Sequence, residues 1–210
     1  MARRKKKRPD RPEGSLDFSV DTVCRNEIEA AIDALVIDEN LIAAHVLASA
    51  AHDVMRGHAD RVGRDLKADM LTILKPLVPG REKSLIDALL APYNAMKHSN
   101  SSDVAVTVHP SLVEATLFCS TQEYGSLFGH LSGKMVFYVA WYTAVQPSLR
   151  GVNGTKPKFL TTAFPSASGP GPRSLQMKEL REVLVQLILE PERLTDAVSR
   201  YSTDGLWDKP

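Results

Sequence analysis

Residues 41–56 read Leu-Ile-Ala-Ala-His-Val-Leu-Ala-Ser-Ala-Ala-His-Asp-Val-Met-Arg, and this stretch decides the fold class. It is apolar on nearly every side, with alanine at many positions. A helix that is apolar all round is normally buried among other elements, and small side chains let neighbouring helices approach closely. Gly57 follows, and glycine very commonly ends a helix. The stretch therefore predicts a central helix over 41–56 in a helical protein.

The apolar residues on both sides of this stretch also recur with helical spacing. Asn26 is placed to cap a helix with an apolar face at Ile28, Ala31, Ile32 and Leu35. Further helices are predicted over 65–77, 84–98, 110–128, 135–145 and 175–189. Pro92 should kink or restart its helix, because proline lacks an amide proton. Strands and helices do not alternate, so we expect an all-α bundle of about five to seven helices.

The composition changes at both ends of the predicted bundle. Residues 1–12 carry seven cations and one acid, whereas the rest of the chain has a net charge of −5. We predict a disordered basic tail over 1–15 and the bundle over 16–148. Residues 149–173 are rich in glycine and proline and should form a loop or linker, and 174–210 should form C-terminal helices that pack on the bundle. The tail is expected to be dispensable for folding and to add affinity for nucleic acid through counterion release.

The composition also excludes several classes of protein. The two cysteines, Cys24 and Cys119, lack the paired spacing of a disulfide framework or a thiolate zinc site. The basic start is not followed by the apolar run of a secretory signal, and the longest apolar run, 135–145, is too short to span a bilayer. We therefore expect a cytoplasmic protein that does not enter a membrane.

Polar side chains break the apolar pattern of the predicted central helix along one line. His45, Ser49, His52 and Arg56 are spaced at i, i+4, i+7 and i+11, positions that stack on one face. An unsatisfied buried polar group costs about 1–3 kcal/mol. These residues should therefore either face water as a half-exposed stripe with hydrogen-bonded histidines or line a cleft. No carboxylate stands in a ligand position on the stripe, so we predict no metal site.

A second polar group ends the helix predicted over 84–98. Asn94, Lys97 and His98 fall within about one turn, so their side chains can reach one pocket. An imidazole with an ordinary pKa of about 6.5 exchanges a proton near neutral pH, and an ammonium group offsets phosphate charge. The alternative is a plain polar helix end, because lysine and histidine favour the last turn of a helix.

The order of these two segments resembles the HEPN superfamily of small helical proteins. The resemblance covers roughly residues 25–147 and rests on His-Val-Leu-Ala-Ser-Ala-Ala-His-Asp-Val-Met at 45–55 and Asn-Ala-Met-Lys-His at 94–98, with Asp103 nearby. The chain is similar in particular to bacterial members with an Ala-rich helix and a later Asn-x-x-Lys-His segment. The resemblance implies a helical bundle, a homodimer and, in active members, metal-independent cleavage of RNA without a cofactor.

The family motif consists of an arginine, then a polar residue and, a few positions later, a histidine. The resemblance places Asn94 at the polar position and His98 at the histidine position. The arginine position falls on Tyr93, which cannot stabilise a phosphoryl transition state as a cation. Either Lys97 or Arg56 takes over this role, or the chain is a non-catalytic member.

We therefore expect a HEPN-like protein that binds RNA and, where another cation replaces the arginine, cleaves it. His98 would exchange a proton with the 2′-hydroxyl or the leaving oxygen, Lys97 would offset phosphate charge and Asn94 would orient the imidazole or the substrate. Both helices are otherwise apolar, so their polar residues are expected to share one hydrated cleft. The residues expected to complete the binding surface of this cleft are Tyr93, His45, His52 and Arg56.

The alternative function is a non-catalytic interaction module that has lost the motif arginine and binds a protein or a nucleotide. A homodimer is expected in either case. The chain has a surplus of apolar helix faces, including the side of Phe137 and Trp141, and a two-fold interface is the commonest way to cover such faces.

Overall fold

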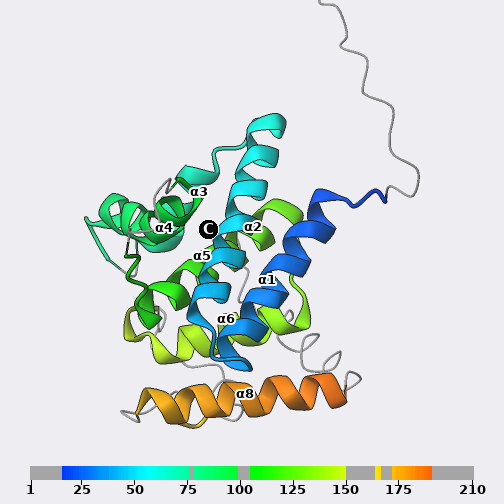
Figure 1. Cartoon of the computed structure of the whole chain (residues 1–210), viewed down its shortest axis with the longest axis vertical. Coiled ribbons are helices and arrows are strands. Elements are labelled where there is room, and N and C mark those ends of the chain that lie inside the picture. Colours follow the sequence, from blue (N-terminus) through cyan, green and yellow to red (C-terminus); the bar gives the residue numbers. More distant parts are fainter. Residues whose placement is uncertain (1–15, 76–77, 99–104, 150–163, 167–171, 191–210) are drawn as a thin grey trace, which may run out of the picture.

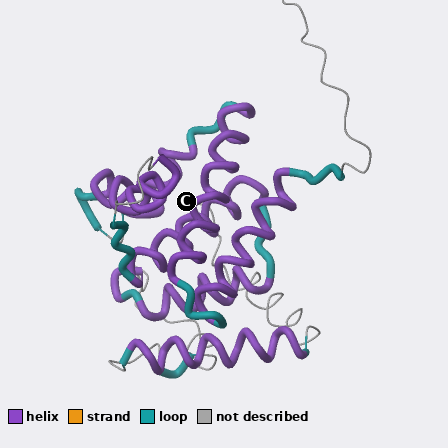
Figure 2. The backbone as a smooth tube through the Cα atoms, in the orientation of Figure 1, coloured by secondary structure: helices purple, strands orange, loops and turns teal. Residues whose placement is uncertain are grey.

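The computed structural model describes residues 16–75, 78–98, 105–149, 164–166 and 172–190. Within these ranges the chain forms seven α-helices and one short 3-10 helix, and it contains no strand (Figures 1 and 2). The prediction of an all-α bundle is therefore confirmed. The helices are α1 (Val20–Val36), α2 (Leu41–Val62), α3 (Leu66–Leu74), α4 (Glu82–His98), α5 (Pro110–Phe128), α6 (Gly133–Val145) and α8 (Arg173–Leu189), with the 3-10 helix η1 at Pro147–Leu149.

Helix α2 lies at the centre of the bundle, between α1 and α5 (Figure 1). Its alanines at 44, 48, 51 and 59 are fully buried, which lets the neighbouring backbones approach closely. Ser120 of α5 donates a hydrogen bond of 2.9 Å to the carbonyl oxygen of Ala48. The thiol of Cys24 on α1 lies 3.9 Å from the carbonyl oxygen of Ala51. The predicted central position of this helix is confirmed.

The first two helices are both longer than predicted. Helix α1 begins at Val20, because the hydroxyl of Ser19 accepts a hydrogen bond of 3.0 Å from the amide of Thr22 and caps the helix. Asn26, the predicted cap, lies within the helix, six residues after its start. Helix α2 runs through Gly57 to Val62, and the residue that caps its end is Gly63, which has a φ of 75°. This left-handed conformation favours glycine, so Gly63 and not Gly57 ends the helix.

The helix does not restart at Pro92, whereas the kink expected there stays a prediction. Helix α4 is continuous from Glu82 to His98, with Pro92 buried inside it. A proline inside a helix removes one backbone hydrogen bond, and here the helix is held by tertiary packing of Ile86 and Leu89. Helix α5 begins at Pro110 and ends at Phe128, the bounds that the sequence predicts.

Helix α6 is buried along most of its length, and α8 lies across the end of the bundle beside it (Figure 1). Phe137 and Trp141 are only 4% and 0% exposed within a single chain. This side of α6 is therefore covered without a second copy, so the homodimer remains a prediction that no longer has this support. Leu180 and Leu184 anchor α8 in the core. Its N-cap is Pro172, so the helix begins two residues before the predicted start at 175.

Several predictions concern segments beyond these ranges. The basic tail over 1–15, residues 150–163 and 167–171 of the predicted loop, and the chain from 191 onward lie outside the described residues. Among the described helices, none combines the length and the apolar character that crossing a membrane requires. Residues 105–109, which precede α5, form neither helix nor strand.

Both cysteines are buried and free, one on each side of α2. Burial, together with the nearby carboxylates of Glu27 and Asp21, raises the pKa of the Cys24 thiol from 9.0 to about 12. Burial raises the pKa of Cys119 well above its ordinary value, and the carboxylate of Glu123 adds to this effect. Both thiols are therefore protonated at neutral pH.

Candidate functional site

The structure separates the predicted site residues into two buried histidines on α2 and an outer group, which consists of Arg56 of α2 and the residues at the end of α4. His45 and His52 are 0% and 5% exposed, so they do not line an open, hydrated cleft. Asn94, Lys97 and His98 are all exposed to solvent. The expectation of one hydrated cleft that contains both groups is therefore wrong, and each group has its own chemistry.

The buried group contains an ion pair between α2 and α5. The Nδ1 atom of His52 lies 2.7 Å from Oε2 of Glu123, whose side chain is 0% exposed. Burial raises the pKa of Glu123, and the hydrogen bond and charge of His52 act in the opposite direction. The His52 imidazole is the partner that makes a buried carboxylate tolerable, since an unpaired charge is very unfavourable in the core. His52 therefore stabilises the contact between the two helices.

His45 lies about two turns before His52 on α2 and is fully buried. Neither of its ring nitrogens has a hydrogen-bond partner among the described residues, and the same holds for the Ser49 hydroxyl. Burial lowers the pKa of His45 below its ordinary value of 6.5, because the core disfavours the charged imidazolium. His45 is therefore neutral at pH 7. It is neither part of a half-exposed stripe nor part of an open binding surface.

We expect His45→Leu to raise the free energy of unfolding by about 1 kcal/mol at pH 7, because it removes two buried polar atoms without partners. The wild type should also lose stability as the pH falls below 6.5. His45 then takes up a proton in the unfolded state, but its lowered pKa keeps it neutral in the folded state. The variant should lose less stability between pH 7 and pH 5. Urea unfolding at both pH values tests this, with exposed His98→Leu as the control. A destabilised His45→Leu protein at pH 7 would contradict the prediction.

The exposed group is tied to α2 by one carboxylate, that of Asp53. Its Oδ2 atom lies 2.6 Å from the Nζ atom of Lys97 on α4, and its Oδ1 atom lies 3.0 Å from the Nη2 atom of Arg56. The ammonium group of Lys97 also lies 5.5 Å from the centre of the Tyr93 ring. Two cations from different helices and an aromatic ring thus come together on one surface. The exposed residues Asn94 and His98 lie in the same last turns of α4. We call Arg56, Tyr93, Asn94, Lys97 and His98 the α4-end surface.

Asp53 and Lys97 on this surface stabilise each other in their charged forms. Burial opposes ionisation of Asp53, but the hydrogen bond from Lys97 and the charges of Arg56 and Lys97 outweigh it and lower the Asp53 pKa. The same hydrogen bond and charge raise the pKa of Lys97. All three groups are therefore charged at neutral pH, which leaves one net positive charge. His98 is exposed, and no other described residue forms a hydrogen bond with its imidazole.

Two of the central residues were not predicted from the sequence. Asp53 lies three residues before Arg56, a spacing typical of helical ion pairs, so its contact with Arg56 could have been found. Glu123 is 71 residues from its partner His52, and no local pattern connects them. The stripe of α2 itself carries no carboxylate, but α5 supplies one beside His52. Among the described residues, no group of three or more His, Cys, Asp or Glu side chains is placed to hold a metal ion.

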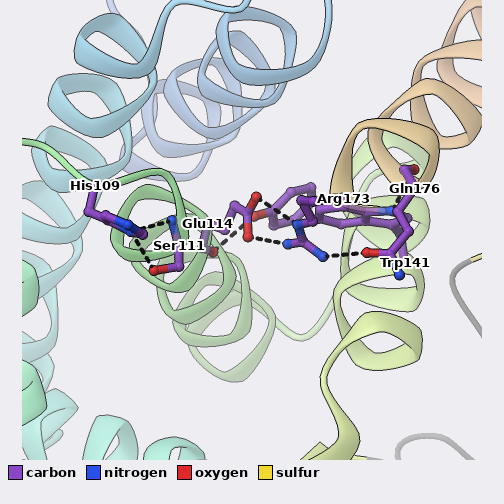
Figure 3. A network of polar contacts seen from close by, with 7 residues as sticks. His109, Ser111, Glu114, Trp141, Arg173 and Gln176 are labelled. Atoms are coloured by element: carbon purple, nitrogen blue, oxygen red, sulfur yellow. Dashed lines mark hydrogen bonds and ion pairs between the residues drawn. The ribbon is translucent and has the colours of Figure 1, made fainter. Parts of the chain in front are cut away.

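A second polar network attaches α8 to the bundle (Figure 3). Arg173 forms an ion pair with Glu114 of α5, and its guanidinium lies 4.4 Å from the centre of the Trp141 ring. The indole N–H of Trp141 donates a hydrogen bond of 2.9 Å to the carbonyl oxygen of Gln176. A groove of about 410 Å³ opens beside the Arg173–Glu114 pair, between α5, α8 and the connection from α1 to α2. The charged groups here bond to one another, so we assign the network a structural role.

Comparison with protein-family models, with curated proteins and with solved structures finds no match to this chain. The resemblance to the HEPN superfamily therefore rests on the two short segments of the sequence. The placement of the α4-end surface is an independent observation, because it comes from the contacts of Asp53 and not from the motif.

Proposed function

We propose that this helical protein binds RNA through the α4-end surface. The observation that carries the proposal is the meeting of Arg56 and Lys97 at Asp53, with distances of 3.0 Å and 2.6 Å. The resemblance to HEPN proteins calls for a cation near Asn94 and His98, and Tyr93 cannot supply it. Arg56 of α2 pairs with the same carboxylate as Lys97 of α4, which supports Arg56 as the cation that replaces the arginine.

The composition of this surface suits a phosphodiester backbone. Lys97 and Arg56 are 46% and 56% exposed, so both cations are open to a ligand as large as a nucleic acid. Cations that neutralise backbone phosphates release counterions, and this release drives binding independently of sequence. Asn94 adds a side-chain amide that can donate to a phosphate oxygen or a base edge. Binding should therefore weaken as the salt concentration rises.

His98 gives this surface the means for cleavage. Its imidazole would accept the proton of a ribose 2′-hydroxyl, whose oxygen then forms a bond to the adjacent phosphorus. The bond from phosphorus to the 5′-oxygen breaks, and that oxygen takes a proton from solvent. The products are a 2′,3′-cyclic phosphate and a 5′-hydroxyl end. Lys97 and Arg56 would offset the charge that develops on the phosphoryl oxygens.

A non-catalytic interaction module is the second candidate function. Two observations favour it: Tyr93 occupies the position of the motif arginine, and no described residue orients the imidazole of His98. A general base normally needs a group that holds it in position. Under this alternative the same surface would bind RNA, or another acidic partner, without cutting it.

The test uses a 5′-labelled single-stranded RNA incubated in EDTA with the full-length protein. The wild type should bind the RNA and release fragments with 2′,3′-cyclic phosphate ends. His98→Ala should slow cleavage by about 100-fold while binding persists, because general-base catalysis typically contributes about 10²–10⁴-fold. Lys97→Gln should weaken binding several-fold, whereas Lys178→Gln on the exposed face of α8 makes the same change of charge and should not.

The outcomes separate the candidates. Binding without cleavage in every variant supports the non-catalytic module. Cleavage that survives in His98→Ala overturns the catalytic role of this residue. Equal affinity in wild type, Lys97→Gln and Lys178→Gln would show that RNA binds elsewhere or only through diffuse charge.

A further inference from the structure

We infer that Asp53 is an internal competitor of RNA at the α4-end surface. The carboxylate occupies the two cations that a backbone phosphate would use, so RNA must displace it to bind. This inference rests on the proposed function and describes how the proposed site is regulated.

The geometry of the contact is that of an occupied anion site. One oxygen of Asp53 lies 3.0 Å from the Arg56 guanidinium and the other lies 2.6 Å from the Lys97 ammonium. A phosphodiester, like a carboxylate, carries one negative charge shared between two oxygens. It could therefore take the same two cations, one for each oxygen. Asp53 and a phosphate are alternative ligands for Lys97 and Arg56.

The three side chains differ in their freedom to move. Asp53 has a short side chain that is 22% exposed, whereas Lys97 and Arg56 have long side chains that are about half exposed. The cations can rotate outward toward a ligand, but the carboxylate remains beside them on α2. Its charge also persists, because Lys97 and Arg56 lower its pKa. Asp53 therefore lowers the attraction of this surface for RNA throughout the neutral pH range.

A bracing role for Asp53 makes the opposite prediction. If Asp53 mainly held Lys97 and Arg56 in position for RNA, its removal would weaken binding, because two long side chains would lose their fixed geometry. A competitor, in contrast, strengthens binding when it is removed. The two roles thus predict changes of affinity with opposite sign, so the sign of the change, measured on folded variants, decides between them.

The experiment measures RNA affinity as a function of salt for the wild type, Asp53→Asn, Asp53→Glu and Asp60→Asn. Asp60 is an exposed acid two turns further along α2, so Asp60→Asn makes the same change of net charge on the same helix. Asp53→Asn should bind about fivefold more tightly at low salt. It should also steepen the salt dependence, because the α4-end surface then carries two net positive charges in place of one. Asp53→Glu keeps the competing charge and should bind like the wild type, and Asp60→Asn should change affinity less than twofold.

The outcomes distinguish the inference from the proposed function. RNA binding by the wild type that is unchanged or weakened in Asp53→Asn overturns the inference and leaves the proposed function in place. An equal gain in Asp60→Asn also overturns it, because the effect is then one of overall charge. No binding by either the wild type or Asp53→Asn overturns both. Thermal unfolding of each variant confirms that the affinities compare folded proteins.

Discussion

Glu123→Ala is expected to lower the free energy of unfolding by about 3–5 kcal/mol, the loss typical when one partner of a buried ion pair is removed. The carboxylate is fully buried and lies 2.7 Å from the His52 imidazole. Without it, His52 keeps a buried ring nitrogen with no acceptor, and a cavity forms between α2 and α5. Urea unfolding followed by circular dichroism measures the change. A loss of this size is a large part of the total stability of a domain.

The double variant His52→Leu/Glu123→Leu is the control for this prediction. Replacing both members of a buried pair with apolar residues is often neutral or stabilising, so the double variant should be clearly more stable than Glu123→Ala. The comparison separates loss of a partner from loss of packing. A double variant as unstable as Glu123→Ala would show that the pair itself is required. A Glu123→Ala protein as stable as the wild type would contradict its burial.

Arg173→Ala is expected to release the start of α8 from the bundle and to lower the free energy of unfolding by about 2 kcal/mol, since it leaves a buried carboxylate without its partner. Burial raises the pKa of Glu114, and Arg173 opposes this shift through its hydrogen bond and charge. The guanidinium also covers the ring of Trp141. Its removal should expose the indole to water and shift its fluorescence emission to longer wavelength.

The measurement is cleanest in a Trp207→Phe background, because the chain has only two tryptophans and Trp141 then reports alone. Lys178→Ala is the matched control. It removes a cation from the exposed face of α8, where Lys178 lies 3.8 Å from Glu182, and should change neither the emission nor the stability measurably. Unshifted emission in Arg173→Ala would show that other contacts hold α8 on Trp141.

The helices could be predicted from the sequence wherever one strong local signal marks each end. Pro110 at the start of α5 and Gly129 after it are such signals, and both bounds are correct. The sequence predicts the end of α2 at Gly57, six residues too early, because the residue type alone does not distinguish Gly57 from Gly63. Their difference lies in the backbone angle that the folded chain imposes, and only Gly63 takes a positive φ. Asn26 misled in the same way, since Ser19 is an equally good cap seven residues earlier.

The candidate site was harder to predict, because its decisive contacts join distant residues. The partner of Lys97 is 44 residues away in the sequence, and that of His52 is 71 residues away. Helical spacing correctly indicates that His45 and His52 share one face of α2. It cannot show whether that face meets water or another helix. Helix α5 covers this face of α2, and Glu123 of α5 pairs with His52. The face is therefore part of the core and not a binding surface.

Because Cys24 and Cys119 are buried, the rates at which their thiols are labelled report how often the core opens. A thiol reacts with alkylating reagents as the exposed thiolate, and burial keeps both groups protonated and inaccessible in the folded state. Each cysteine can therefore be modified only while its helix is transiently displaced. Because one thiol reports on α1 and the other on α5, the two labelling rates compare how often the bundle opens on either side of α2.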